Sequence, residues 1–84
     1  MLSQLMHYVY ILLCSDKRTY IGLTKDLKDR VNRHQSVWVP VTKYRIPIEL
    51  TTYFAFKSET TARNFEKYLK SGSGRAFIKK HNFF

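Results

Sequence analysis

The stretch that decides the fold spans residues 8–23 and reads YVYILLCSDKRTYIGL. Its first six residues are aromatic, β-branched or leucine and are apolar throughout, which predicts a strand that is covered on both faces. Residues 14–18 then carry three charged side chains and are typical of a turn, and residues 19–23 resume the strand pattern. The whole stretch is therefore predicted to form a β-hairpin.

The register of this hairpin decides where two of its tyrosines point. If the turn pairs Leu12 with Tyr20 and Tyr10 with Gly22, both tyrosines project from one face of the sheet as diagonal neighbours. A slip by one residue would send one of them to the other face. Tyrosines in strands are ordinarily packing residues, whereas a glycine inside a strand often marks the close approach of a backbone or ligand. Both interpretations stay open at this point.

Downstream of the hairpin, the periodicity of the sequence changes to that of a helix. Asp26 can cap this first helix, in which Leu27, Val31 and His34 follow helical spacing. Residues 35–47 are irregular and contain both prolines. Apolar residues then alternate over residues 48–56, which predicts a third strand.

The last third of the chain is predicted to be helical. Ser58 can cap a second helix with Ala62, Phe65 and Leu69 as its apolar stripe. We expect residues 71–74, which read SGSG, to break it, and residues 75–81 to form a last short helix. The predicted order is ββαβαα: an α+β fold in which helices flank a small three-stranded antiparallel sheet, in one domain over residues 1–84.

The charge balance favours a polyanion as the partner. Fifteen Lys and Arg face six Asp and Glu, and the formal net charge is +9. The apolar fraction of 44% is too high for a disordered basic tail, so the chain is expected to fold. A basic folded domain without an amphipathic basic helix favours nucleic acid over a membrane surface. The basic residues are densest in the C-terminal half, at Lys57, Arg63, Lys67, Lys70, Arg75, Lys79 and Lys80.

Cysteine usage and the distribution of apolar residues exclude several classes of protein. Cys14 is the only cysteine, so neither an internal disulfide nor a cysteine-based zinc site can form. The longest apolar run, over residues 8–14, is far shorter than a membrane span. Residues 1–13 lack the basic start of a signal peptide. We therefore expect a cytoplasmic protein that does not enter a membrane.

Two charged residues fall beside the apolar stripes of the predicted helices. Arg30 shares the side of the first helix that carries Leu27. Either its stem packs while its head reaches water, or its guanidinium binds a phosphate. Glu66 lies between the stripe and the polar face of the second helix. Either it pairs with a neighbouring cation (Arg63, Lys67 or Lys70), which helical spacing alone favours, or it holds a divalent cation.

Taken together, these residues resemble the GIY-YIG nuclease superfamily. Val9-Tyr10-Ile11 and Tyr20-Ile21-Gly22 are similar to the two half-motifs that give the family its name, with Val9 in place of the first glycine. The resemblance continues through the helix that carries Arg30 to a segment around Glu66 that is similar to small standalone bacterial members. It covers residues 8–80, with the parts in the right order, which makes it more specific than any single motif.

The resemblance implies a metal-dependent endonuclease that hydrolyses phosphodiester bonds in DNA, in repair or recombination. It implies Tyr10, Tyr20, Arg30 and Glu66 as catalytic residues, with Glu66 holding Mg²⁺ or Mn²⁺ and Arg30 contacting the scissile phosphate. Either tyrosine could position or deprotonate the attacking water, and we lean slightly to Tyr20. We expect the four catalytic residues to line one concave, basic surface. The resemblance further implies four substrate-binding residues: Gly22, Lys25, His34 and Lys70.

Two alternatives on the same fold stay open: a nucleic-acid-binding module that no longer cuts, and a protein-interaction domain. The segment of residues 35–45 departs from the family pattern because it carries Trp38, flanked by Val37 and Val39. Either Trp38 folds back on the core or it forms a surface for self-association.

Overall fold

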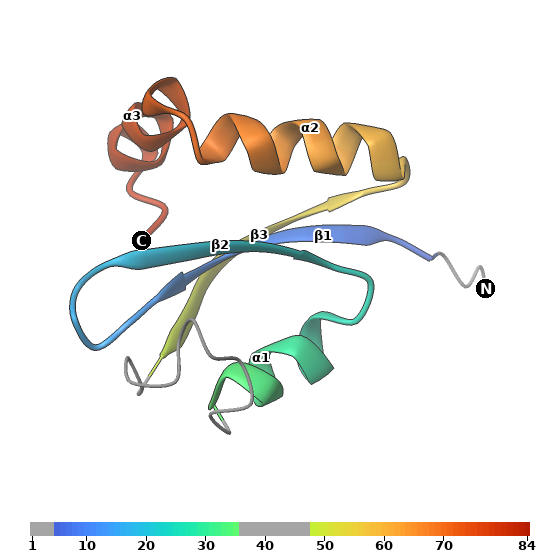
Figure 1. Cartoon of the computed structure of the whole chain (residues 1–84), viewed down its shortest axis with the longest axis horizontal. Helices are drawn as coiled ribbons and strands as arrows, with labels where there is room; N and C mark the ends of the chain where they lie inside the picture. The colour runs from blue at the N-terminus through green and yellow to red at the C-terminus, as the bar shows by residue number, and fades with distance from the viewer. Residues whose placement is uncertain (1–4, 36–47) are drawn as a thin grey trace.

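A computed structural model of the chain describes residues 5–35 and 48–84. Its elements follow in the predicted order ββαβαα. They are β1 (His7–Leu13), β2 (Thr19–Thr24), α1 (Leu27–Gln35), β3 (Glu49–Phe56), α2 (Glu59–Leu69) and α3 (Gly72–His81). The strands form one antiparallel sheet in the order β2-β1-β3, with α1 on one face and α2 and α3 on the other (Figure 1). The predicted fold class is confirmed.

The hairpin adopts the register that sends both tyrosines to one face. Tyr10 pairs with Gly22 and Leu12 pairs with Tyr20. In the turn, the backbone N–H of Cys14 donates to the Arg18 carbonyl at 2.9 Å. The intervening Lys17 has a φ of 69°, in the left-handed region that glycine and asparagine adopt most readily.

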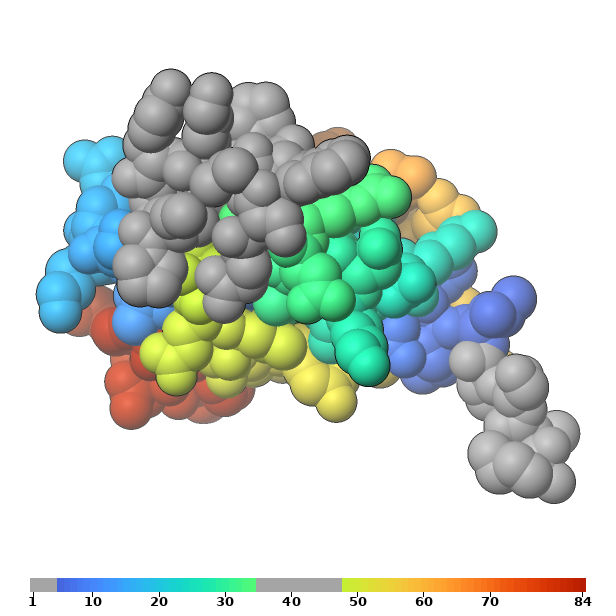
Figure 2. All heavy atoms as spheres, turned by 90° about the horizontal axis from the view of Figure 1, so that it is seen from below, coloured from blue at the N-terminus to red at the C-terminus, as the bar shows by residue number. Residues whose placement is uncertain are grey.

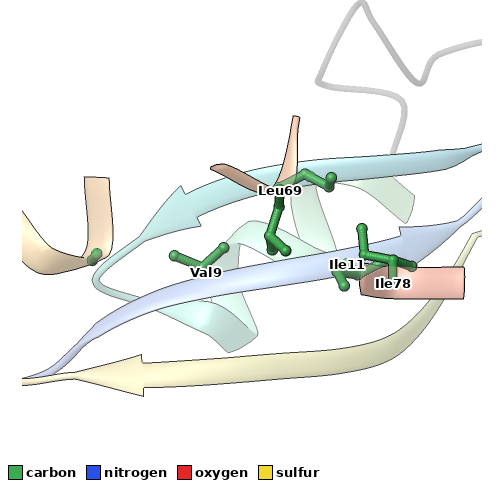
Figure 3. Packing of buried hydrophobic residues seen from close by; sticks show 6 residues of the cluster. Val9, Ile11, Leu69 and Ile78 are labelled. Carbon is green, nitrogen blue, oxygen red and sulfur yellow. The ribbon is translucent and has the colours of Figure 1, made fainter. Parts of the chain in front are cut away.

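The face of the sheet under α2 and α3 buries one of two apolar clusters. Val9 and Ile11 project from β1 onto this face and pack against Leu69 of α2 and Ile78 of α3 (Figure 3). Ile21 and Ala62 complete the fully buried part of this cluster. A rim of partly buried phenylalanines surrounds it: Phe54, Phe56, Phe65, Phe77 and Phe83.

The opposite face, under α1, buries the second cluster. Successive residues of a strand point to opposite faces, so Tyr10 and Leu12 alternate with Val9 and Ile11. This second cluster also contains Cys14, which is 3% exposed. The remaining members come from β2, α1 and the start of β3: Tyr20, Leu27, Val31, Ile48 and Leu50.

The predicted caps of the first two helices are present. The Asp26 carboxylate accepts from the backbone N–H of Asp29 at 3.0 Å, and the Ser58 hydroxyl accepts from that of Thr61 at 3.2 Å. Each cap satisfies a backbone donor that has no partner within the helix.

The third helix begins at Gly72, earlier than predicted from the SGSG segment. Ser71 caps it by accepting from the backbone N–H of Gly74 at 3.1 Å. A Cβ atom at Gly74 would overlap the carbonyl oxygen of Tyr68 and the Cα of Leu69, so this glycine permits the tight junction between α2 and α3. Glycine here permits two helices to pack closely. The prediction that residues 71–74 are non-helical treated glycine only as a helix breaker.

An irregularity in the sheet anchors the C-terminal segment. The pairing of β1 with β3 shifts between Ile11 and Leu12, which leaves Thr51 as the extra residue of a bulge. The Thr51 hydroxyl lies 3.1 Å from the carbonyl oxygens of both Ile11 and Phe83. Among the described residues, no helix is long and apolar enough to cross a membrane.

Candidate functional site

Three rings meet between β1, β2 and α1. The hydroxyl of Tyr10 lies 3.2 Å from Nε2 of His34, and neither side chain is exposed to solvent. The ring of Tyr20 lies 4.9 Å from that of His34 and 6.3 Å from that of Tyr10, measured between centroids. Tyr20 is only partly buried, so it is the member of this ring cluster that reaches the surface.

Gly22 makes room for the ring cluster. A Cβ atom at this position would overlap the hydroxyl oxygen and Cζ of Tyr10. The Tyr10 ring is fully buried and cannot swing away without displacing its neighbours. Gly22 therefore lets the Tyr10 hydroxyl extend across β2, which forms one edge of the sheet.

Burial and charge hold both buried members of the ring cluster neutral at physiological pH. Burial, followed by the nearby Tyr20 hydroxyl, raises the pKa of Tyr10 to about 12, although Arg30 opposes the shift. Burial and the charge of Arg30 lower the pKa of His34. The Tyr10 hydroxyl thus keeps its proton and can donate it to Nε2 of His34 when the ring carries its own proton on Nδ1.

Arg30 is the cation that faces the ring cluster. It lies one helical turn before His34 on α1, and its charge acts on both His34 and Tyr10. The side chain is partly buried and not fully solvated. Arg30 lines a surface groove beside Lys25 and Arg33, and both interpretations of Arg30 from the sequence stay open.

Glu66 projects from α2, whose axis lies on the other face of the sheet (Figure 1). Its Oε2 atom accepts from Nζ of Lys70 at 3.0 Å, and the Glu66 side chain is 21% exposed against 54% for Lys70. The simpler interpretation of Glu66, an ion pair along the helix, is therefore observed. Its negative charge also contributes, as the smallest cause, to the raised pKa of Tyr10.

Two surface grooves border β2. The first, here called the turn-side groove, has a volume of about 810 Å³ and lies between the hairpin turn and α3, which are neighbours in space (Figure 2). Tyr20 lines it, as does Lys70. The second, the α1-side groove, lies at the other end of β2 and is lined by Leu23, Lys25 and Arg30 among others.

A divalent cation would have one protein carboxylate to bind in this arrangement. No group of three or more His, Cys, Asp or Glu side chains within residues 5–35 and 48–84 is placed to hold a metal ion. Glu66 alone fits Mg²⁺ chemically, since this ion commonly keeps several waters and uses one or two carboxylates. A carboxylate has two oxygens, and Lys70 engages Oε2. The residues present thus fit a cation that is coordinated mainly by water and phosphate.

The structure brings together only some of the residues predicted for the site. Tyr10, Tyr20, His34 and Arg30 converge on the α1 side of the sheet, with Gly22 beneath the Tyr10 hydroxyl. The four predicted catalytic residues do not share either groove: Tyr20 lines one and Arg30 the other, Tyr10 is buried, and Glu66 lines neither.

The predicted substrate-binding residues fall into two groups. Gly22 and His34 are buried and shape the ring cluster, whereas Lys25 and Lys70 are exposed and line the grooves. Trp38 and its neighbouring valines lie outside the described residues, so the predicted self-association surface has no structural description.

Sequence reasoning missed the two hairpin-turn cations, Lys17 and Arg18, as candidate site residues. They face α3 across the turn-side groove. A signal was present in the sequence: the turn between two strong strands contains no glycine or asparagine at the point where the chain reverses.

The ββαβαα fold and the paired tyrosines on one sheet face define a catalytic domain of the GIY-YIG type. The chain belongs to this family, because the family model described as the GIY-YIG catalytic domain matches residues 6–82. It is a family of nucleases that act on DNA.

Relatives of similar size share most of the chain. UPF0213 proteins of Streptococcus pyogenes serotype M5 (strain Manfredo) and serotype M1 are each 37% identical over 79 residues, which cover 88% of this chain and 86% of theirs. The solution NMR structure of a UPF0213 protein from Bacillus halodurans is 33% identical, with a TM-score of 0.58, over 89% of this chain and 83% of that one. The names of these relatives give no activity, so the chemistry of this chain has to be argued from its residues.

Proposed function

We propose that this protein is a divalent-metal-dependent DNA endonuclease whose site centres on Gly22 at the open edge of β2. The observation that carries the proposal is the ring cluster: a buried Tyr10–His34 pair holds Tyr20 at the surface beside a basic groove. Membership in a nuclease family supports the reaction type, hydrolysis of a phosphodiester by water.

The two tyrosines take different roles in this proposal. Tyr10 is out of contact with solvent, and its raised pKa of about 12 keeps the hydroxyl protonated, so it is unsuited to accept a proton from water. Tyr20 is partly exposed and lines a groove that substrate can enter. Tyr20 therefore orients or deprotonates the attacking water, and Tyr10 holds the neighbouring rings in position.

Arg30 and Glu66 supply the charge that the reaction needs. The Arg30 guanidinium acts from the α1 side and balances negative charge on the phosphate oxygens as it builds up. Glu66 holds the cation with water ligands, as one carboxylate can do for Mg²⁺ or Mn²⁺. When bound, the cation would stabilise the leaving oxygen. Lys70 holds the Glu66 carboxylate in place until DNA arrives.

The decisive experiment is the change Glu66→Gln, tested by nicking of supercoiled plasmid with Mg²⁺ and with Mn²⁺. Glutamine keeps the size and hydrogen-bonding capacity of the side chain but removes the charge that holds a cation. We expect nearly complete loss of cleavage, while DNA binding persists or tightens because a negative charge near phosphate is gone.

Glu59→Gln is the matched control for this experiment. Glu59 also lies on α2 and also pairs with a cation one turn later, Arg63; it lines the α1-side groove but is not proposed to hold the cation. The control should cleave DNA as the unchanged protein does. Cleavage by Glu66→Gln at the control's rate would refute the assignment of Glu66.

A second candidate, a nucleic-acid-binding module that does not cut, is favoured by one specific observation. Lys70 already occupies one oxygen of the only carboxylate proposed to bind the metal. If linear, nicked, flapped and branched DNA all stay intact with either metal while they bind in the basic grooves, this second function holds.

A further inference from the structure

The two grooves beside β2 lie on opposite sides of the proposed scissile position. Tyr20 and Ile21 line the turn-side groove, whereas Leu23 and Thr24 line the α1-side groove. Gly22, beneath the Tyr10 hydroxyl, lies between these pairs. A DNA strand that crosses the site along β2 would therefore place one flank in each groove.

The turn-side groove presents positive charge, and no acidic side chain lines it. Its cations come from the hairpin turn, the end of α2 and two turns of α3: Lys17, Arg18, Lys70, Arg75 and Lys79. Of these cations, Lys70 pairs with Glu66, and the side chains of the groove carry a formal charge of +4 when that carboxylate is counted. Such a groove attracts phosphates and gains affinity by releasing their counterions.

The α1-side groove is close to neutral by comparison. Lys25, Arg30, Arg33 and Arg63 line it together with the acids Asp26, Asp29 and Glu59, which gives a formal charge of +1 with His7 neutral. Two of its arginines are engaged within the groove wall, in the ion pairs Arg33–Asp29 at 3.0 Å and Arg63–Glu59 at 2.6 Å. This side has little charge left for a DNA backbone.

The hairpin turn adds an independent observation. Lys17 occupies a left-handed backbone conformation with φ 69°. That conformation is less favourable for an L-residue than for glycine, because the Cβ atom comes too close to the following carbonyl oxygen. A lysine at this position is a poor choice for the turn, and its side chain contributes a cation to the groove opposite Arg75 and Lys79. The sequence thus keeps charge at a point where backbone geometry favours glycine.

We propose that this protein grips DNA asymmetrically, by backbone phosphates in the turn-side groove, on one side of the bond that it cuts. The proposal rests on the proposed function for the position of that bond. It assigns the substrate's essential contacts to one flank of several nucleotides, and it makes the flank over the α1-side groove dispensable. The enzyme should consequently be able to cut close to one kind of DNA end and not close to the other.

Binding is tested with two neighbouring lysines of α3, of which one lines the turn-side groove and the other does not. Lys79 and Lys80 are both exposed and both lie in the last turn of the helix, but only Lys79 lines the turn-side groove. Affinity for a fluorescent duplex is measured by anisotropy in EDTA over a range of salt. Lys79→Ala should lower the slope of log affinity against log salt by about 0.9, the value for one phosphate contact, and Lys80→Ala should change it much less.

A third variant, Lys17→Gly, removes charge without harming the turn. Glycine suits the left-handed conformation, so thermal stability should stay the same or rise while affinity falls as it does in Lys79→Ala. Equal effects of Lys79→Ala and Lys80→Ala, or DNA affinity of Lys17→Gly at the level of the unchanged protein, would overturn the asymmetric grip.

The second arm of the test maps cleavage positions near DNA ends. This mapping can be done without knowing which sequence the protein prefers. A linear duplex labelled at the 5′ end or the 3′ end is digested lightly with Mn²⁺, and the positions of cuts are mapped toward each end of one strand. The expected profile reaches one end and stops several nucleotides short of the other. A symmetric profile contradicts the proposal.

The two arms separate this proposal from the proposed function. If the unchanged protein cuts no DNA, the nuclease assignment fails while the lysine comparison still decides the grip. If it cuts DNA with symmetric end profiles and both lysine variants bind alike, the grip fails and the nuclease stands.

Discussion

The hydroxyl of Tyr10 and Nε2 of His34 lie 3.2 Å apart in the interior, and together they join the central strand of the sheet to the last turn of α1. Neither group reaches solvent, so the pair cannot contact a substrate directly. Its effect on function has to pass through Tyr20, whose ring lies against His34 and opens onto the turn-side groove.

Replacing each tyrosine by phenylalanine should separate positioning from chemistry. Tyr20→Phe should lower the cleavage rate by about 100-fold or more, because a proton-transfer group contributes 10²–10⁴-fold, and should leave stability and DNA affinity nearly unchanged. Tyr10→Phe should destabilise the fold by about 1–2 kcal/mol, because His34 loses a buried partner, and should reduce the rate less. Single-turnover cleavage and urea unfolding measure the two effects. The reverse pattern would exchange the roles of the tyrosines.

The stability of the protein should depend on pH through His34. Its pKa in the folded state lies below the unfolded value of about 6.5, so the folded protein binds fewer protons. The contribution is therefore fully present above pH 6.5 and is lost as the pH falls below it, by at most about 1.4 kcal/mol per pH unit. Urea unfolding at pH 8 and pH 5.5 gives the difference. His34→Gln should flatten this dependence, and the control His81→Gln, at an exposed site, should not.

Alanine at Gly22 and at Gly72 should have opposite effects on stability. At Gly22 the added methyl overlaps the buried Tyr10 ring, and overpacking of this kind costs about 1–3 kcal/mol. At Gly72 nothing lies within 4 Å of the added atom, and alanine in a helix gains about 0.5–1 kcal/mol over glycine. Thermal unfolding compares the two variants. Stabilisation by Gly22→Ala would show that Tyr10 does not lie over β2 as described.

DNA affinity should fall steeply with salt. If the turn-side groove contacts about four phosphates, the slope of log affinity against log salt should be about −3.6 for duplex DNA. Anisotropy titrations between roughly 50 and 200 mM salt would measure it. An affinity that is the same at both ends of this range would exclude phosphate contacts as the main source of binding.

The hairpin was predictable from sequence because a continuous apolar run, a charged turn and a second strand pattern follow one another. Its register, and with it the face to which the tyrosines point, was left open by the sequence and is defined by the pairing of Tyr10 with Gly22. The caps Asp26 and Ser58 were predictable because their effects are local. An ion pair between Glu66 and Arg63, Lys67 or Lys70 was also favoured by helical spacing, and the structure shows the pair with Lys70.

Other features depend on contacts between distant segments and could not be inferred. The bulge at Thr51 is defined by the pairing of β3 with β1 and by a contact to Phe83. The start of α3 at Gly72 depends on how closely α2 approaches. The burial of His34 follows from the docking of α1 onto the sheet, which turns a residue proposed to contact substrate into a partner of Tyr10.

The burial of Cys14 makes its thiol a natural probe of local unfolding. The sulfur belongs to the only cysteine of the chain and lies in the cluster between β1, β3 and α1, 3% exposed. An aromatic disulfide that releases a coloured thiolate can therefore react with Cys14 only when this part of the protein opens. The rate of that reaction then measures the free energy of the opening. Each substitution beneath α1 can be ranked in this way at native temperature, without denaturant and without an added cysteine.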